Sequence, residues 1–125
     1  MVLSFMIHQG EYDMDLSIET HDDIAVVILH TEELNAGNAK WFKSEITPVF
    51  DKYTRVILDM NEIRFVDSSG CGTILSCFRQ LHSIDGDLKL AGVQKPVQTL
   101  FELVRLHRII EIYSDKASAI QSFSR

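Results

Sequence analysis

The sequence has few of the features that define a disulfide scaffold, a metal site or a membrane protein. Its two cysteines, Cys71 and Cys77, are six residues apart with no histidine pair nearby, which gives neither a disulfide framework nor a zinc set. We interpret both as reduced residues in or near the core, and we expect no metal and no cofactor. The longest apolar run, residues 24–29, is far shorter than the ~20 residues that span a bilayer. The first ten residues contain no basic leader, so the sequence predicts a soluble, cytoplasmic protein without membrane insertion.

Positive charge is also scarce. The chain has 12 Lys and Arg against 18 Asp and Glu, which gives a formal net charge of −6. An average surface of this sign repels nucleic acids and anionic lipids, because both carry negative charge. We therefore expect no nucleic-acid partner.

The length and the apolar content indicate one domain. The 125 residues with 46% hydrophobic content supply one core and leave no room for a second domain. Residues 1–13 show no clear period, which indicates an N-terminal tail or a short extra strand. We place the domain at residues 14–125, and we find no internal repeat in it.

Strand-like and helix-like patterns alternate along this domain. A polar turn after residue 20 makes the first two strands a hairpin, residues 31–37 form a polar loop, and Pro48 kinks or ends the first helix. The third helix begins at Pro96 and turns Val97, Leu100, Phe101 and Val104 inward. The expected strands are residues 16–18, 24–29, 55–58, 88–92 and 109–113, and the expected helices begin near residues 39, 68, 96 and 115. This order predicts an α/β fold with a mixed, mostly parallel sheet, one antiparallel hairpin and about four helices.

The most informative segment is a strand-to-helix turn, where Asp67, Ser68 and Ser69 are followed by Gly70 and Gly72. In one interpretation Asp67 or Ser68 only caps the helix, a role worth about 1 kcal/mol. In the other, the helix N-terminus tolerates a phosphoserine, which adds about −1.5 to −2 charges to the surface where a partner docks. The two glycines fit both interpretations, because they remove side chains beside the hydroxyls.

The run Asp-Ser-Ser-Gly-x-Gly at residues 67–72, after the apolar pair Phe65-Val66 and at the start of an apolar helix, resembles the signature of the STAS domain family. The resemblance covers residues 14–123 in the order of elements. It implies the fold and function of an anti-sigma factor antagonist. In that group the anti-sigma factor is a serine kinase that phosphorylates the first serine after the aspartate, here Ser68, and a PP2C-type phosphatase removes the phosphate. The unphosphorylated antagonist binds the anti-sigma factor and frees the sigma factor.

The resemblance also implies a partner-binding surface. The family's loop after the long early strand usually reads Gly-Glu-Leu-Asp or close to it, and residues 31–35 here read Thr-Glu-Glu-Leu-Asn. Asn35 therefore replaces a carboxylate used in partner contact with an amide of the same shape. The partner-binding residues implied are Asn35, Asp67, Ser68, Ser69, Gly70 and Gly72.

Enzymatic activity is not expected. Residues 66–70 do not form the Gly-x-Ser-x-Gly elbow of hydrolases. His82 lies about 21 Å along the helix from Ser68 at 1.5 Å per residue, too far to act as a base. His30, at the end of the long strand, is the one histidine expected near Ser68. We predict no catalytic residue.

Two alternatives stay open. Trp41 lies off the face set by Phe42 and Ile46, so it is either an exposed anchor for a partner or half-buried under the N-terminal segment. The protein is either an antagonist as described or a STAS signalling or scaffold module without a sigma factor, which regulates a transporter, polysaccharide, motility or sensory complex.

Overall fold

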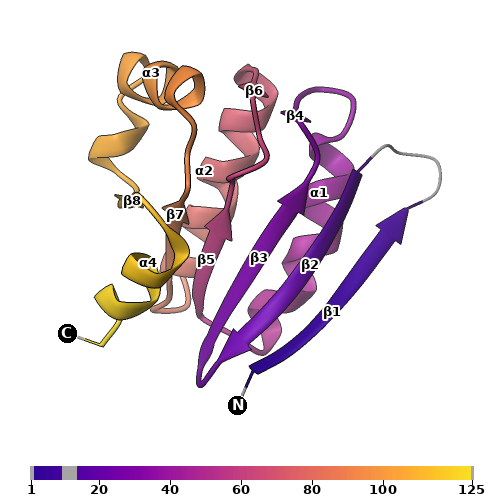
Figure 1. Ribbon diagram of the computed structural model, residues 1–125, viewed down its shortest axis with the longest axis vertical. Helices are drawn as coiled ribbons and strands as arrows, with labels where there is room; N and C mark the ends of the chain where they lie inside the picture. The colour runs from indigo at the N-terminus through magenta and orange to yellow at the C-terminus, as the bar shows by residue number, and fades with distance from the viewer. Residues whose placement is uncertain (1, 10–13, 125) are drawn as a thin grey trace.

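A six-stranded sheet in the order β1-β2-β3-β5-β7-β8 forms the centre of the computed structural model, which describes residues 2–9 and 14–124 (Figure 1). The strands β1, β2 and β3 pair antiparallel, and β3, β5, β7 and β8 pair parallel. The strand bounds are β1 (Val2–Gln9), β2 (Met14–His21), β3 (Ile24–His30), β5 (Arg55–Asp59), β7 (Asp87–Ala91) and β8 (Ile112–Tyr113). The predicted α/β class with a mixed sheet is confirmed. Of the predicted N-terminal segment, residues 1 and 10–13 lie outside the described part of the chain.

The four α-helices of residues 2–9 and 14–124 cover the two faces of the sheet unequally. The helices α1 (Ala39–Ile46), α2 (Ser68–His82) and α3 (Lys95–Leu103) pack with one set of strand residues into the main core, whereas α4 (Lys116–Ser122) packs on the opposite face (Figure 1). The alternation of β3 accounts for both cores, because successive side chains of a strand point to opposite faces. Ala25, Val27 and Leu29 enter the main core, and Ile24, Val26 and Ile28 enter the smaller one.

Two short strands form a separate sheet that the sequence did not predict. Strand β4 (Glu33–Leu34) pairs parallel with β6 (Phe65–Val66), so the expected polar loop over residues 31–37 contains a strand. The side chain of Leu34 is fully buried in the main core, which fixes this segment in place. The small sheet therefore holds the loop before α1 against the start of α2.

Three further expectations need correction. Trp41 is neither an exposed anchor nor half-buried under the N-terminal segment: it is 5% exposed in the main core, because α1 packs on both the sheet and α2 and so buries a wider arc than one stripe. Val104 is 52% exposed and lies beyond the end of α3. The last strand is shorter than expected, because a 3-10 turn, η2 (Leu106–Arg108), precedes it and leaves Ile109 on the surface. The prediction for Pro48 is confirmed, since α1 ends at Ile46 and a 3-10 turn, η1 (Thr47–Asp51), follows.

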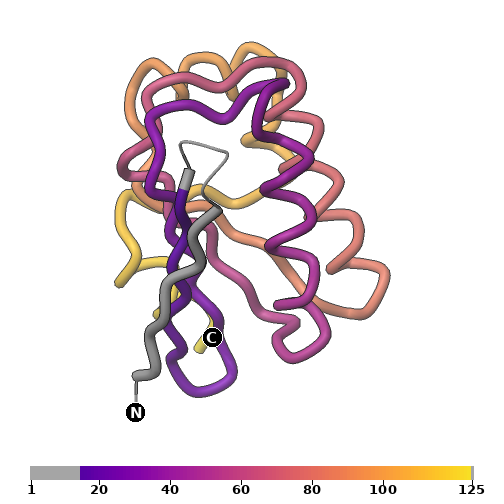
Figure 2. The backbone as a smooth tube through the Cα atoms, turned by 90° about the vertical axis from the view of Figure 1, so that its right-hand side faces the viewer, coloured from indigo at the N-terminus to yellow at the C-terminus, as the bar shows by residue number. Residues whose placement is uncertain are grey.

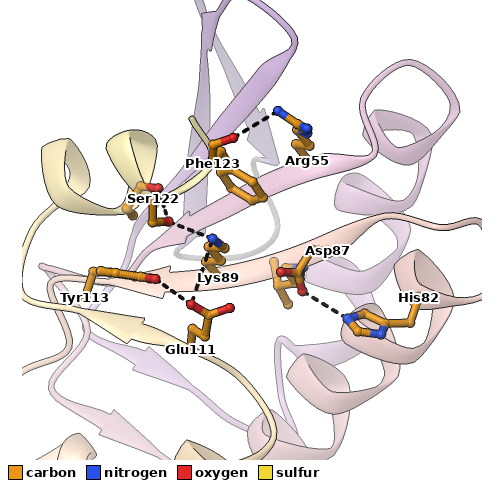
Figure 3. Close-up of polar contacts among 10 residues, drawn as sticks. Arg55, His82, Asp87, Lys89, Glu111, Tyr113, Ser122 and Phe123 are labelled. Carbon is orange, nitrogen blue, oxygen red and sulfur yellow. Dashed lines mark hydrogen bonds and ion pairs between the residues drawn. The ribbon is translucent and has the colours of Figure 1, made fainter. Parts of the chain in front are cut away.

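A buried lysine holds the end of α4 on the sheet (Figure 3). Lys89 on β7 is only 6% exposed, and its Nζ donates a hydrogen bond of 2.7 Å to Ser122 Oγ at the end of α4. The same Nζ lies 4.1 Å from the ring centroid of Phe123 and 3.9 Å from Glu111 Oε1. The hydroxyl, the ring and the carboxylate together compensate the desolvated ammonium group.

Candidate functional site

The start of α2 is fixed by Asp67. This residue has extended backbone angles, and its Oδ1 accepts a hydrogen bond of 2.9 Å from the backbone N–H of Gly70. It is therefore the N-cap, and the helix begins at Ser68, as the sequence predicted. Of the two interpretations of this segment, the structure therefore shows the helix cap, and it is formed by Asp67 and not by Ser68.

The same carboxylate also binds the loop before α1. Its Oδ2 accepts a hydrogen bond of 3.0 Å from the backbone N–H of Ala36, while the backbone N–H of Asp67 donates to the carbonyl of Leu34. Asp67 therefore links α2 to the segment that contains the predicted partner residue Asn35. The Asp67 side chain thus adds to the β4–β6 pairing in holding the two parts of the predicted surface, residues 35 and 67–72, next to each other.

Asn35 has a structural task in this loop. Its Oδ1 accepts a hydrogen bond of 2.8 Å from the backbone N–H of Gly37, and its backbone N–H donates to Asn38 Oδ1. The Nδ2 group donates to Glu33 Oε1 at 3.4 Å. An amide suits this position, because an aspartate carboxylate would face the carboxylate of Glu33.

The two glycines of the motif occupy different environments. A Cβ on Gly70 would lie 2.5 Å from the carbonyl oxygen of Leu34 and 2.7 Å from a methyl group of Val66, so only glycine lets the loop and the helix approach this closely. Gly70 is buried by its own chain, and its place in partner binding stays a prediction. A Cβ on Gly72 would meet nothing within 4 Å, and Gly72 lies exposed on the helix surface.

Both serines of the motif are exposed at the start of α2. In the part of the chain that the structure describes, neither hydroxyl has a hydrogen-bond partner, so both are free to react or to contact another molecule. Ser68 and Gly72 are four residues apart and lie on the same side of the helix. One helical turn after Ser68, the exposed backbone of Gly72 therefore lies on the surface without a covering side chain.

The electrostatics of the site are dominated by Asp67. Hydrogen bonds from the backbone N–H groups of Gly70 and then Ala36 hold the pKa of its carboxyl below the ordinary value, so it is ionised at neutral pH. Burial, followed by the charge of Asp67, raises the pKa of the Cys71 thiol. Cys71 is therefore a protonated thiol and a poor nucleophile.

His30 does not serve the motif. Its Nδ1 lies 2.7 Å from Glu62 Oε2 in the segment after β5, and its Nε2 lies 2.8 Å from Ser17 Oγ on β2, so both ring nitrogens already have partners outside the motif. The expectation that it neighbours Ser68 finds no support in these contacts. The exposed Ser68 hydroxyl thus has no histidine base in its described surroundings.

Two site features were missed by the sequence reasoning. The Ala36 N–H and the Leu34 carbonyl both act through the backbone, which carries no residue-type signal. The one available sign was Leu34 itself, an apolar residue inside an otherwise polar loop. Its burial is what brings this backbone to Asp67 and Gly70.

Neither a membrane-spanning helix nor a metal-binding cluster occurs among the described residues. None of their helices is both long enough and apolar enough to cross a bilayer. None of their His, Cys, Asp and Glu side chains form a group of three that could hold a metal ion.

Known proteins resemble this chain along most of its length. The STAS domain family matches residues 15–119, and the chain belongs to this family. The anti-sigma-B factor antagonist of Listeria monocytogenes is 28% identical over 102 residues, which cover 80% of this chain and 89% of that protein. The anti-sigma F factor antagonist of Paenibacillus polymyxa is 23% identical over 110 residues, covering 86% and 93%.

Solved structures agree on the fold. The crystal structure of an anti-sigma factor antagonist from Mycobacterium paratuberculosis superposes with a TM-score of 0.82 at 17% identity, covering 90% of this chain and 96% of the other. A Thermotoga maritima crystal structure gives a TM-score of 0.78 at 27% identity, covering 86% and 93%. The family resemblance predicted from the Asp-Ser-Ser-Gly-x-Gly run is confirmed.

Proposed function

We propose that this protein is an anti-sigma factor antagonist whose binding is switched by phosphorylation of Ser68. In this proposal the unphosphorylated form binds an anti-sigma factor, which is also the serine kinase, and thereby frees a sigma factor. A PP2C-type phosphatase restores the binding form. The relatives named as antagonists support the class of function, and the free, exposed Ser68 hydroxyl beside a bare helix surface is the observation that carries the switch.

The proposal that phosphorylation of Ser68 weakens partner binding follows from the hydrogen bonds of the Asp67 cap. The N–H groups of Gly70 and Ala36 are already bound to Asp67, so a phosphate on Ser68 would gain little from them. Instead it would add about −1.5 to −2 charges next to an ionised carboxylate on the exposed surface. The helix N-terminus offsets the repulsion from Asp67 within the fold, whereas a docked partner must accommodate the added charge, so the main effect is on binding.

The contact surface in this proposal centres on Ser68, Gly72 and the loop around Asn35. Gly72 gives a partner backbone access to the helix, because no side chain stands there. Asp67 keeps the loop and the helix in register, so Asn35 and Ser68 are presented together. The role of Gly70 is to make that register possible by its missing Cβ.

The test is a titration of the anti-sigma factor kinase with wild type, Ser68→Asp and Ser68→Ala, with Ser69→Asp as the matched control. Ser68→Asp is expected to weaken binding by about thirtyfold or more, because an uncompensated charge in an interface commonly costs about 2 kcal/mol. Ser68→Ala is expected to bind at near wild-type strength, and Ser69→Asp is expected to weaken binding less.

Phosphopeptide mapping and melting curves complete this experiment. Phosphate is expected on Ser68, and the melting temperature of Ser68→Asp should change little, because a carboxylate at a helix N-terminus is tolerated. Phosphate on Ser69 alone, or a Ser68→Asp variant that binds like wild type while Ser68→Ala fails, contradicts the proposal.

A further inference from the structure

An exposed apolar corner lies between α3 and β8, far along the chain from Ser68. Leu103 is 78% exposed, Val104 52% and Ile109 50%, which makes residues 103–109 the densest group of exposed large hydrophobic residues in the described structure. The side chains of Leu106 and Ile110 are buried in the main core and fix the same segment in place. Because these two residues fix the segment, Leu103, Val104 and Ile109 cannot rotate into the core. A group of exposed apolar side chains on a small domain is typical of a contact surface.

This corner is also basic, in a chain whose net charge is −6. Arg105 and Arg108 are exposed, and among the described residues no carboxylate lies within ion-pair distance of either. Arg105 has a left-handed backbone with φ of 63°, which ends α3 and turns the chain into η2. We define the basic corner as residues 103–109.

A surface of the opposite character lies beside the small sheet. A hollow of about 370 Å³ is lined by Glu32, Glu33, Arg64 and Phe65, and Phe65 is 52% exposed. Arg64 pairs with Glu32 only loosely, at 3.6 Å, and both side chains are about three-quarters exposed. Two carboxylates against one guanidinium leave the hollow with a negative charge beside the exposed ring of Phe65. We call it the acidic hollow.

We propose that the basic corner of one molecule docks into the acidic hollow of a second copy of this chain. Charge and apolarity are complementary: aliphatic side chains with free guanidinium groups meet an exposed aromatic ring flanked by carboxylates. A bilayer is the less suitable partner, because the chain as a whole is acidic and the corner lacks the aromatic residues common in membrane-interface segments.

The positions of the two surfaces favour a closed dimer. The helix α3 contacts β6, and Figures 1 and 2 both show α3 and the β4–β6 sheet at the same end of the molecule. A two-fold axis at that end pairs corner with hollow twice, once in each direction. Two identical contacts close the assembly, whereas a single head-to-tail contact would continue into a filament.

Sedimentation equilibrium of the purified protein, over roughly a hundredfold range of concentration, tests this proposal. Wild type is expected to show a concentration-dependent dimer. The variant Arg105→Glu/Arg108→Glu and the variant Glu32→Lys/Glu33→Lys are each expected to weaken dimerisation about tenfold or more, because each opposes like charges across both contacts. An equimolar mixture of the two variants is expected to dimerise again, since both contacts then join opposite charges.

Matched controls separate this effect from net charge and from misfolding. Lys52→Glu/Arg79→Glu lowers the net charge by the same amount as Arg105→Glu/Arg108→Glu, but at exposed residues outside both surfaces. It is expected to leave the dimer unchanged. Leu103→Ser tests the apolar part at a side chain with almost no folding role, and is expected to weaken the dimer with no loss of melting temperature. A wild type that stays monomeric, or a charge-swapped mixture that fails to dimerise, overturns the proposal.

Discussion

Gly70 and Gly72 allow the same substitution to be made twice in one helix with opposite expected results. An alanine at Gly70 places its Cβ 2.5 Å from the Leu34 carbonyl oxygen, so the loop and the helix must separate by about 0.9 Å to reach the 3.4 Å of ordinary contact. An alanine at Gly72 meets nothing within 4 Å. Any difference between the two variants therefore reports the packing at Gly70 alone.

The magnitude for Gly70→Ala follows from three contributions. Overpacking of a tight contact costs about 1–3 kcal/mol. The required shift also strains the hydrogen bond from the Asp67 N–H to the Leu34 carbonyl, a net contribution of about 0.5–1.5 kcal/mol. Higher helix propensity returns up to about 1 kcal/mol. We expect the free energy of unfolding to fall by about 2 kcal/mol for Gly70→Ala and to rise by about 0.5–1 kcal/mol for Gly72→Ala.

Urea titration and thermal melts of the three proteins measure these changes. For a domain of this size 1 kcal/mol corresponds to roughly 3–6 °C, so Gly70→Ala should melt about 6–12 °C below wild type and Gly72→Ala a few degrees above it. A Gly70→Ala protein as stable as Gly72→Ala would refute the close approach of Leu34 to this helix.

Two further predictions concern charged groups. Ser122→Ala should lower the free energy of unfolding by about 1–3 kcal/mol, because it leaves the buried Lys89 ammonium without its hydroxyl partner, and Lys89→Met should offset most of that loss in a double-mutant cycle measured by urea unfolding. Asp67→Asn should melt below wild type at pH 7. Since folding lowers the pKa of Asp67, its contribution is present above the ordinary value of 3.8 and is lost as the pH falls through the lower folded value. The difference in melting temperature between Asp67→Asn and wild type should therefore shrink in acid, and a constant difference would contradict the cap.

The sequence allowed the start of α2 to be predicted because its signals are local. An N-cap residue, two small polar residues and an apolar stripe lie within one segment, and each has a physical meaning without knowledge of the rest of the chain. The same holds for Pro48, where a helix had to end. The candidate site could be predicted for this reason, since its main residues are consecutive, and its role in partner binding stays a prediction.

The features that were missed depend on distant parts of the chain. Strand β4 has two residues, and it forms only because Leu34 is buried next to Gly70, thirty-six residues later. Trp41 was assigned from the single apolar stripe of Phe42 and Ile46, whereas α1 contacts α2 and also shares the main core with the strands. The turn at Arg105 uses a left-handed backbone at a residue that rarely adopts it, so no residue type marked the end of α3 there.

The ends of the described fold lie far from its proposed contact surface. Strand β1 begins and α4 finishes toward the end of the molecule opposite the β4–β6 sheet and the start of α2 (Figure 1). A fluorescent label, an affinity tag or a tether to a sensor chip attached at either end would thus stand clear of Ser68. The protein can be immobilised in both orientations, and binding measured through the two attachments should agree, which gives partner titrations an internal check on surface artefacts.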